Sequence, residues 1–198
     1  RKSAQALQEA EEKQEALISS LRPENWQSPE EFVSALDELR HQRGHLLTIR
    51  DYRYMDSTAV LALEQQVIEA QEQLGEKTVD FLATDKSLAP YFDRIRELDD
   101  AIENAVSIME LSPHADSLNQ LAAGLDLLSE LVATLKVQDA TVRTRIIESI
   151  SEVYALVNQS KARTQHKEKS LGSAEAVAQF GAQFKLFSQS VSLSLIHI

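Results

Sequence analysis

Leucine and valine recur at alternating intervals of three and four residues between positions 118 and 135. The repeated positions are Leu118, Leu121, Leu125, Leu128, Val132 and Leu135. This spacing is the heptad pattern of helices that pack along a shared seam, and Leu127 and Leu131 widen it enough to predict contact with more than one neighbouring helix. The chain has only 5 Gly and 4 Pro in 198 residues and is rich in the strong helix formers Ala, Leu, Glu and Gln. The sequence therefore predicts an all-α fold.

Capping and turn residues divide the chain into about six or seven helices. A polar first helix is predicted over residues 1–21, where Glu11 and Gln14 interrupt the apolar seam and indicate weak packing or a solvated coiled coil. Ser28–Glu31 has the pattern of a capping box with proline at the first helical position, so a second helix is predicted from there to about Tyr54. Further boundaries are predicted at Asp56–Ser57, Asp85–Pro90, Ser112–Pro113, Asp139–Thr141 and Gly172–Ser173. Short connections favour antiparallel neighbours, and we expect an elongated antiparallel helical bundle or coiled-coil arm.

Composition excludes several classes of function. The net charge of −11 opposes non-specific attraction to nucleic acid or to anionic lipid, except where basic residues cluster locally. The absence of cysteine excludes thiol catalysis and thiolate metal sites and is compatible with a reducing cytoplasm. No apolar run approaches the roughly 20 residues that span a bilayer, so we expect a cytoplasmic protein without a membrane partner. No phosphate-binding loop motif occurs, and we expect neither a cofactor nor catalysis.

Basic and aromatic residues interleave between Arg40 and Tyr54. The candidate contact residues of this segment are Arg40, Arg43, Arg50 and Arg53. Arginine binds phosphate through two parallel hydrogen bonds and stacks on rings, which is compatible with a nucleic-acid contact. Leucines share this face, however, and nearby carboxylates can neutralise the arginines, so we favour packing between helices. Gly44 within this helix is unfavourable unless another backbone approaches it closely, which also indicates packing.

A second basic run contains Lys161, Arg163, Lys167 and Lys169. We interpret it as the solvated C-terminal end of a helix, where positive charge is favourable for the helix dipole. Nucleic-acid binding is the alternative.

His41 and His45 are four residues apart, which is the spacing of a zinc-binding pair. Zinc hydrolases of this pattern also need a glutamate after the first histidine as general base, and this chain has Gln42 instead. No third ligand is apparent in the sequence, so we expect two surface or interface histidines and no metal.

The final six residues, Leu193–Ile198, reverse-translate into the transposon end that is ligated to DNA fragments for short-read sequencing. The apolar stripe of Val177, Phe180, Phe184, Phe187 and Val191 stops just before them, since its next position is Ser194. We therefore interpret 193–198 as translated adapter and residues 1–192 as a helical coiled-coil region of a longer protein. A genuine short helix end is the alternative.

Several longer runs resemble the middle region of the bacterial DNA repair ATPases. They are residues 29–37, 43–54, 125–131, 140–146 and 175–190. The resemblance extends over residues 1–192. It implies a very long chain with a β-rich N-terminal region, a helical coiled-coil middle and an AAA-type ATPase module nearer the C-terminus.

These observations predict a non-catalytic helical segment that links or spaces the modules of a DNA repair ATPase and contacts them. Because no nucleotide-binding motif occurs here, no catalytic residue is transferred from the family. The alternatives are a self-standing homo-oligomeric coiled coil, supported by the heptad at 118–135, and an arm that contacts DNA weakly through the basic residues.

Overall fold

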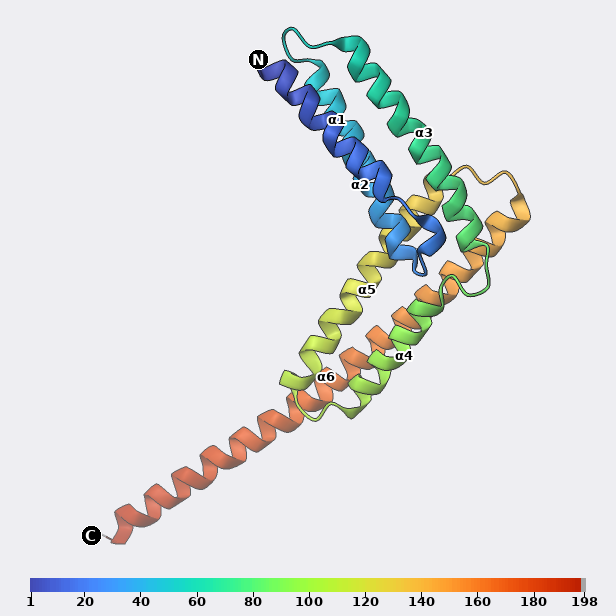
Figure 1. Cartoon of the computed structure of the whole chain (residues 1–198). Helices are drawn as coiled ribbons and strands as arrows, with labels where there is room; N and C mark the ends of the chain where they lie inside the picture. The colour runs from blue at the N-terminus through green and yellow to red at the C-terminus, as the bar shows by residue number, and fades with distance from the viewer. Residues whose placement is uncertain (197–198) are drawn as a thin grey trace. The chain divides into compact units, whose positions relative to one another are not determined.

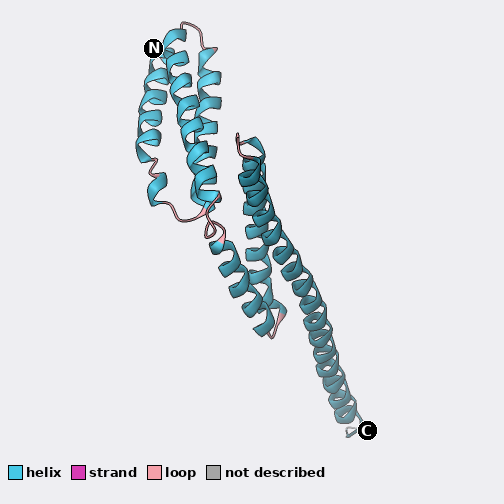
Figure 2. Cartoon of the chain, turned by 90° about the vertical axis from the view of Figure 1, so that its right-hand side faces the viewer, coloured by secondary structure: helices cyan, strands magenta, loops and turns pink. Residues whose placement is uncertain are grey.

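The computed structural model describes residues 1–196, and within them the chain is helical without strands (Figures 1 and 2). The helices are α1 (Lys2–Ser20), α2 (Pro29–Arg50), α3 (Ser57–Leu82), α4 (Ala89–Asn104), α5 (Ile108–Thr134) and α6 (Ala140–Ile196), with a 3-10 turn η1 (Pro23–Asn25). The predicted all-α class is confirmed. The interpretation of residues 197 and 198 as adapter-encoded lies outside the described residues.

The chain divides into two units. Unit 1 contains residues 1–90 and 124–151, and unit 2 contains residues 91–123 and 152–198. Helices α5 and α6 contribute residues to both units.

Three predicted helix starts are confirmed by their capping contacts. The Glu31 carboxylate accepts hydrogen bonds from the backbone N–H of Gln27 at 2.8 Å and of Ser28 at 3.2 Å, which forms the capping box of α2. The Asp56 carboxylate accepts from the Ala59 N–H at 3.1 Å at the start of α3. Asp139 accepts from the Thr141 N–H at 2.8 Å at the start of α6. These contacts satisfy donors that the first turn of a helix leaves without a backbone partner.

Helix α2 ends earlier than predicted. It stops at Arg50, and a turn over residues 51–54 follows, in which Tyr54 has a positive φ of 64°. A non-glycine residue in this left-handed region cannot continue a right-handed helix. The segment Arg40–Tyr54 is therefore part helix and part turn, and its arginines do not all share one helical face.

The predicted boundary at Ser112–Pro113 is wrong, because Pro113 lies inside α5. The helix begins at Ile108, where Ser107 Oγ accepts from the Glu110 N–H at 3.1 Å and the Glu110 carboxylate accepts from the Val106 N–H at 3.0 Å. This arrangement resembles a capping box, except that the glutamate accepts from the residue before the N-cap, and it fixes the start more than a turn before the proline. Pro113 lies in the second turn of the helix, where it removes the one backbone hydrogen bond that its own N–H would have donated to the Met109 carbonyl and leaves the others in place.

The predicted break at Gly172–Ser173 is also wrong, since α6 runs without interruption from Ala140 to Ile196. A single glycine in a helix costs only about 1 kcal/mol relative to alanine and does not by itself end the helix. The described residues therefore contain six α-helices, the lower of the two predicted numbers. The basic run at 161–169 lies in the interior of a helix rather than at its end.

Unit 1 is built on α1, α2 and α3, which lie side by side in both views (Figures 1 and 2). Its apolar core includes Phe32, Leu39 and Leu46 of α2, all of which are fully buried. The Phe32 ring stacks on Phe81 of α3 with centroids 4.7 Å apart and meets Trp26 edge to face at 4.9 Å. These aromatic contacts anchor the first turn of α2 to the end of α3 and to the connection that precedes α2.

The expected weak packing of α1 is wrong, because Gln14 is 1% exposed and joins three helices. Its amide N–H donates to the Leu63 carbonyl and to the Gln66 side-chain oxygen, both at 3.0 Å. Gln42, also buried, donates to the Ala10 carbonyl at 3.1 Å and to the Gln14 side-chain oxygen at 3.3 Å. The polar residue in the seam of α1 is therefore a buried interhelical contact and not a sign of solvation.

Unit 2 contains α4, the first half of α5 and the part of α6 that begins at Glu152. Its buried residues recur every three or four positions along each helix, as the apolar periodicity predicts. On α4 they are Tyr91, Ile95, Leu98 and Ile102, and on α6 they are Val153, Val157, Ser160 and Thr164.

The heptad of α5 is buried or half-buried at all of its positions. Leu118, Leu125 and Leu128 are almost fully enclosed, and Leu131 of the widened stripe joins the core of unit 1. Leu127, the other residue of the widened stripe, is exposed and does not join this core. The prediction of an α5 seam is confirmed, whereas the wider stripe is only partly buried.

Gly44 makes no close helix contact, because a Cβ built on it would meet nothing within 4 Å. The predicted approach of another backbone to Gly44 is therefore wrong, whereas at Gly75 a Cβ would lie 3.2 Å from the side-chain atom Leu135 Cδ2. We therefore expect Gly44→Ala to raise the free energy of unfolding by about 0.5–1 kcal/mol, through better helix propensity. Gly75→Ala is the matched control and should give a smaller gain or a loss. Urea unfolding followed by circular dichroism measures both, and equal gains would contradict the close packing at Gly75.

Candidate nucleic-acid and partner interface

The four arginines of the first basic segment lie on α2 and on the turn after it, and all are exposed. Arg43 Nε lies 3.5 Å from a carboxylate oxygen of Glu64, so this side chain joins α2 to α3. The Arg53 guanidinium lies over the Tyr54 ring at 4.9 Å, and the Arg53 carbonyl accepts from Ser3 Oγ at 2.6 Å. Two of the four residues therefore hold neighbouring elements of unit 1 together.

Arg40 lies beside acidic residues. It lines a groove of about 300 Å³ between α2 and the second half of α5, together with the carboxylates Glu30, Asp37 and Glu130. Three carboxylates against one guanidinium make the field of this groove negative, which repels phosphate. For Arg50, no ion pair is found among residues 1–196.

The second basic segment connects α6 to α4 within unit 2. Arg163 Nη1 lies 3.3 Å from Asp99 Oδ2, and Lys167 Nζ donates to the backbone carbonyl of Glu103 at 2.8 Å. Glu103 is in the last turn of α4, whose final carbonyls have no partner within the helix. A cation there also interacts favourably with the negative end of the α4 dipole.

The expectation that these cations neutralise the end of their own helix is therefore corrected, because the run lies inside α6, where Lys167 caps the end of α4 and Arg163 pairs with Asp99 of the same helix. Lys161 is half-buried and Lys169 is exposed, and neither forms an ion pair within the described residues. Of the four basic residues in this segment, only Lys161 and Lys169 form neither an ion pair nor a hydrogen bond with another helix among the described residues. Two separated lysines do not make a continuous row of cations for a phosphate backbone.

The two histidines lie one turn apart on the surface of α2. His41 and His45 are both exposed, and the His41 ring nitrogen Nδ1 lies 2.8 Å from the Asp37 carbonyl. In the part of the chain that the structure describes, no group of three or more His, Cys, Asp or Glu side chains is placed to hold a metal. Gln42, which replaces the general base of the zinc hydrolase pattern, belongs to the buried contacts with α1.

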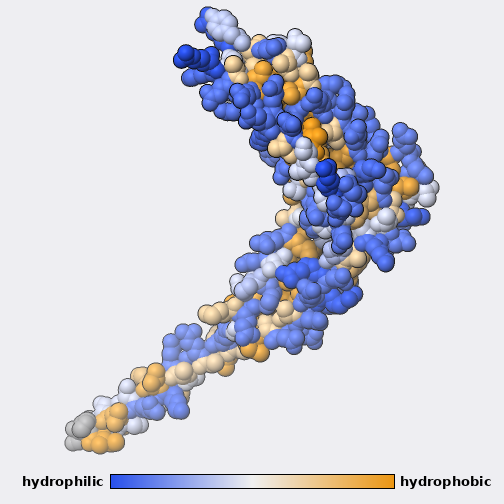
Figure 3. Space-filling model, viewed as in Figure 1, coloured by the Kyte–Doolittle hydropathy of each residue, from blue (hydrophilic) through white to orange (hydrophobic). Residues whose placement is uncertain are grey.

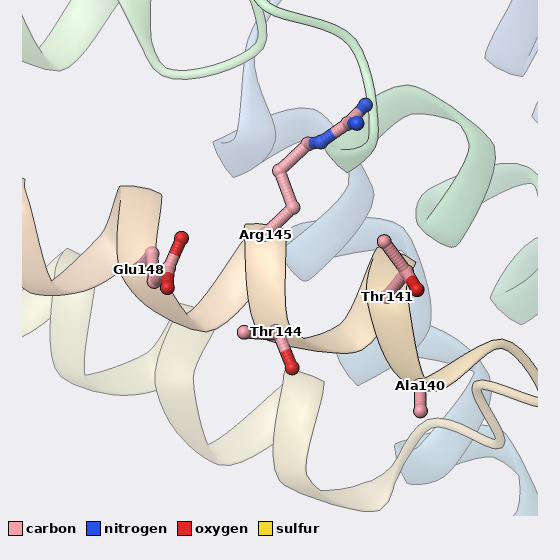
Figure 4. Close-up of a pocket in the computed structure, with 5 residues that line it drawn as sticks. All are labelled: Ala140, Thr141, Thr144, Arg145 and Glu148. Carbon is pink, nitrogen blue, oxygen red and sulfur yellow. The ribbon is translucent and has the colours of Figure 1, made fainter.

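A shallow hollow of about 400 Å³ lies over the first turns of α6. All of its lining residues belong to this one helix, namely Ala140, Thr141, Thr144, Arg145 and Glu148. Figure 4 shows that the Arg145 and Thr144 side chains point in opposite directions. Because these groups do not converge on a common point, the hollow lacks the arrangement of a catalytic site.

The end of α6 presents an apolar surface whose exposure was not predicted. From Ser173 to Ile196 every residue is exposed, and Figure 3 shows hydrophobic residues along this part of the chain. The stripe of Val177, Phe180, Phe184, Phe187 and Val191 is 42–71% exposed. The sequence spacing identified the stripe but could not reveal that no described helix covers it.

Residues 86–170 match the sequence model of a domain of unknown function (DUF7902). The matched region includes α4, α5 and the packed part of α6, and therefore both the Asp99–Arg163 pair and the Lys167 contact. Comparison with curated proteins and comparison with solved structures gave no match. The description of the matched domain states no activity, so the resemblance to DNA repair ATPases stays a prediction.

Among residues 1–196, no helix combines the length and the apolar character needed to cross a membrane.

The contact between α4 and α6 can be measured with a double-mutant cycle. Asp99→Ala and Arg163→Ala should each lower the free energy of unfolding, with a coupling energy of about 0.2–1 kcal/mol, because the two side chains are 24% and 64% exposed. Lys169→Ala is the matched control and should change stability by less than about 0.5 kcal/mol. A coupling energy of zero would contradict a contribution of this pair to the packing of α6 on α4.

Proposed function

We propose that this chain is a non-catalytic helical segment that links or spaces the modules of a larger ATPase, acting as a coiled-coil arm in that protein. Its role is mechanical: it maintains helix register and offers surfaces to other parts of the assembly. The nucleotide chemistry belongs to another module, since none of the nucleotide-binding motifs occurs in these residues.

The observation that supports this proposal most directly is the use of the basic side chains. Arg43, Arg163 and Lys167 each contact a neighbouring helix, at 3.5, 3.3 and 2.8 Å respectively. A dedicated nucleic-acid surface would present such groups to phosphate instead. The placement of these cations therefore favours a scaffold over a nucleic-acid-binding protein. The net charge of −11 favours the same conclusion, because it repels phosphate.

The assignment to an ATPase is supported by the resemblance of residues 1–192 to the middle region of the bacterial DNA repair ATPases. It implies that other modules of the same protein are the partners, and that any contact with DNA belongs mainly to the parent. A cytoplasmic location follows from this proposal. The alternatives are a self-standing homo-oligomeric coiled coil and an arm that contacts DNA weakly.

The DNA-contact alternative can be tested by fluorescence anisotropy with a labelled duplex. We expect no saturable binding below about 0.1 mM protein, and an anisotropy that does not change with salt concentration. Binding to DNA requires protein cations that neutralise phosphates and displace the counterions of the DNA, and here several of these cations contact neighbouring helices instead. Tighter binding that weakens steeply with salt would contradict the scaffold proposal. In that event Lys161→Ala with Lys169→Ala, compared with Arg50→Ala, would identify the segment responsible.

The ATPase proposal can be tested by long-read sequencing of the source DNA across codon 193. We expect the source DNA after codon 192 to encode residues other than Leu193–Ile198. The same reading frame should continue into further helical sequence and reach a phosphate-binding loop. A stop codon directly after Ile198, confirmed in the source, would instead favour the self-standing interaction module.

A further inference from the structure

We propose that the groove between α2 and the second half of α5 binds a helix of a partner protein, with an apolar face and basic residues on both sides of that face. The inference goes beyond the proposed function and does not depend on an ATPase parent, because it uses only residues of α2 and α5. Both walls of the groove belong to unit 1. They are formed by one face of each helix, namely Glu30, Val33, Ser34, Asp37 and Arg40 on α2 and Gly124, Leu127, Glu130 and Leu131 on α5.

The shape of the groove fits the side chains of a helix better than a small molecule. Its volume of about 300 Å³ is at the lower limit of the ~300–1,000 Å³ typical of small-molecule pockets. The lining residues recur every three or four positions on each wall, so the groove follows α2 from Glu30 to Arg40 over about 15 Å. A helix that binds in a groove inserts apolar side chains at the same spacing.

The floor of the groove is apolar and partly open. Leu131 is buried and Val33 is half-buried, whereas Leu127 is 55% exposed. Gly124 lies one turn before Leu127 on the same face of α5, and a Cβ built on it would meet nothing within 4 Å. At this point α5 presents backbone without a side chain, which permits a close approach by the partner.

The charges of the groove favour a basic partner. Glu30 and Asp37 on one wall and Glu130 on the other outnumber the single cation, Arg40. A basic helix places its cations against carboxylates on both sides of the apolar floor, whereas an acidic helix meets like charge. The net charge of −11 of the whole chain favours the same partner at longer range.

A second copy of this chain lacks such a helix among its exposed apolar residues. Between Ser173 and Ile196, where the apolar stripe of α6 lies, the single cation is Lys185. The basic run at 161–169 is also unsuitable, because Arg163 and Lys167 contact α4. The charges therefore favour a different protein as the partner.

Isothermal titration of the full chain with two synthetic peptides tests the choice of partner. Each peptide has about 14 residues, enough to span the groove as a helix, with leucines at intervals of three and four. The flanking positions are lysine in one peptide and glutamate in the other. The lysine peptide should bind at least about tenfold more tightly, and its affinity should fall as salt rises. Equal affinities, or no saturable binding of the lysine peptide, would overturn the proposal.

A filled groove tests the position of the site. Gly124→Phe places a large side chain where the chain has no atom within 4 Å, and it should weaken binding of the lysine peptide about tenfold. Gly124→Ala is the matched control and should keep most of the affinity. If the chain instead associates with itself and Gly124→Phe abolishes that association, the groove belongs to a second copy and the proposal is wrong.

A charge variant tests the site without a change of volume. Glu30→Gln, Asp37→Asn and Glu130→Gln together should also weaken binding of the lysine peptide about tenfold, because they remove the three carboxylates of the groove. The matched control changes three exposed carboxylates that do not line it, with Glu38→Gln, Glu72→Gln and Glu76→Gln. Circular dichroism checks that every variant keeps its helix content. Unchanged affinity in both groove variants would show that the peptide binds elsewhere and would overturn the proposal.

Discussion

The register of the first three helices depends on the buried amides of Gln14 and Gln42. Apolar seams of Leu, Ala and Val tolerate a shift by one helical turn, because one aliphatic side chain replaces another at similar volume. The two glutamines do not, since such a shift would leave buried amide groups without hydrogen-bond partners at about 1–3 kcal/mol each. The contacts of Gln14 with Leu63 and Gln66, and of Gln42 with Ala10, therefore select one alignment of α1, α2 and α3. The aromatic contacts of Phe32 and the pairing of Arg43 with Glu64 require that same alignment.

Charge has a comparable role in unit 2, although at lower energy. The α4 helix ends without a glycine, and the Glu103 carbonyl in its last turn accepts a hydrogen bond from Lys167 of α6. Together with the pairing of Arg163 and Asp99, this contact fixes which part of α6 lies beside the end of α4. An acidic chain thus uses scarce cations where they join two helices. Cations that bind a neighbouring helix are not available to bind phosphate. The packing of α6 on α4 is therefore compatible with the proposed role as a scaffold.

The sequence predicted most of the fold because helix starts are encoded locally. Ser28 with Glu31, Asp56 and Asp139 each identify a helix start through a side chain that reaches its own first turn. The errors arose where a breaker residue was given more weight than a cap. Pro113 and Gly172 lie inside helices, whereas Ser107 followed three residues later by Glu110 was a local start signal that could have been recognised. Burial was less predictable, since neither the enclosure of Gln14 nor the exposure of Phe184 follows from spacing alone. Which face is covered depends on contacts between residues distant in sequence.

The exposed end of α6 shows how a helix can form where no described helix packs against it. Forming the first turn is the unfavourable step in helix formation, and each later residue adds one hydrogen bond at little cost. The packed turns of α6, including Val153, Val157 and Thr164, supply that nucleus. Residues 173–196 then extend an existing helix, with several alanines and glutamines favouring extension and three phenylalanines opposing it slightly. Their helical state is therefore close to marginal in isolation. Burial of the phenylalanine stripe by any partner would stabilise the helix and the interface together, so the two properties are expected to vary in parallel.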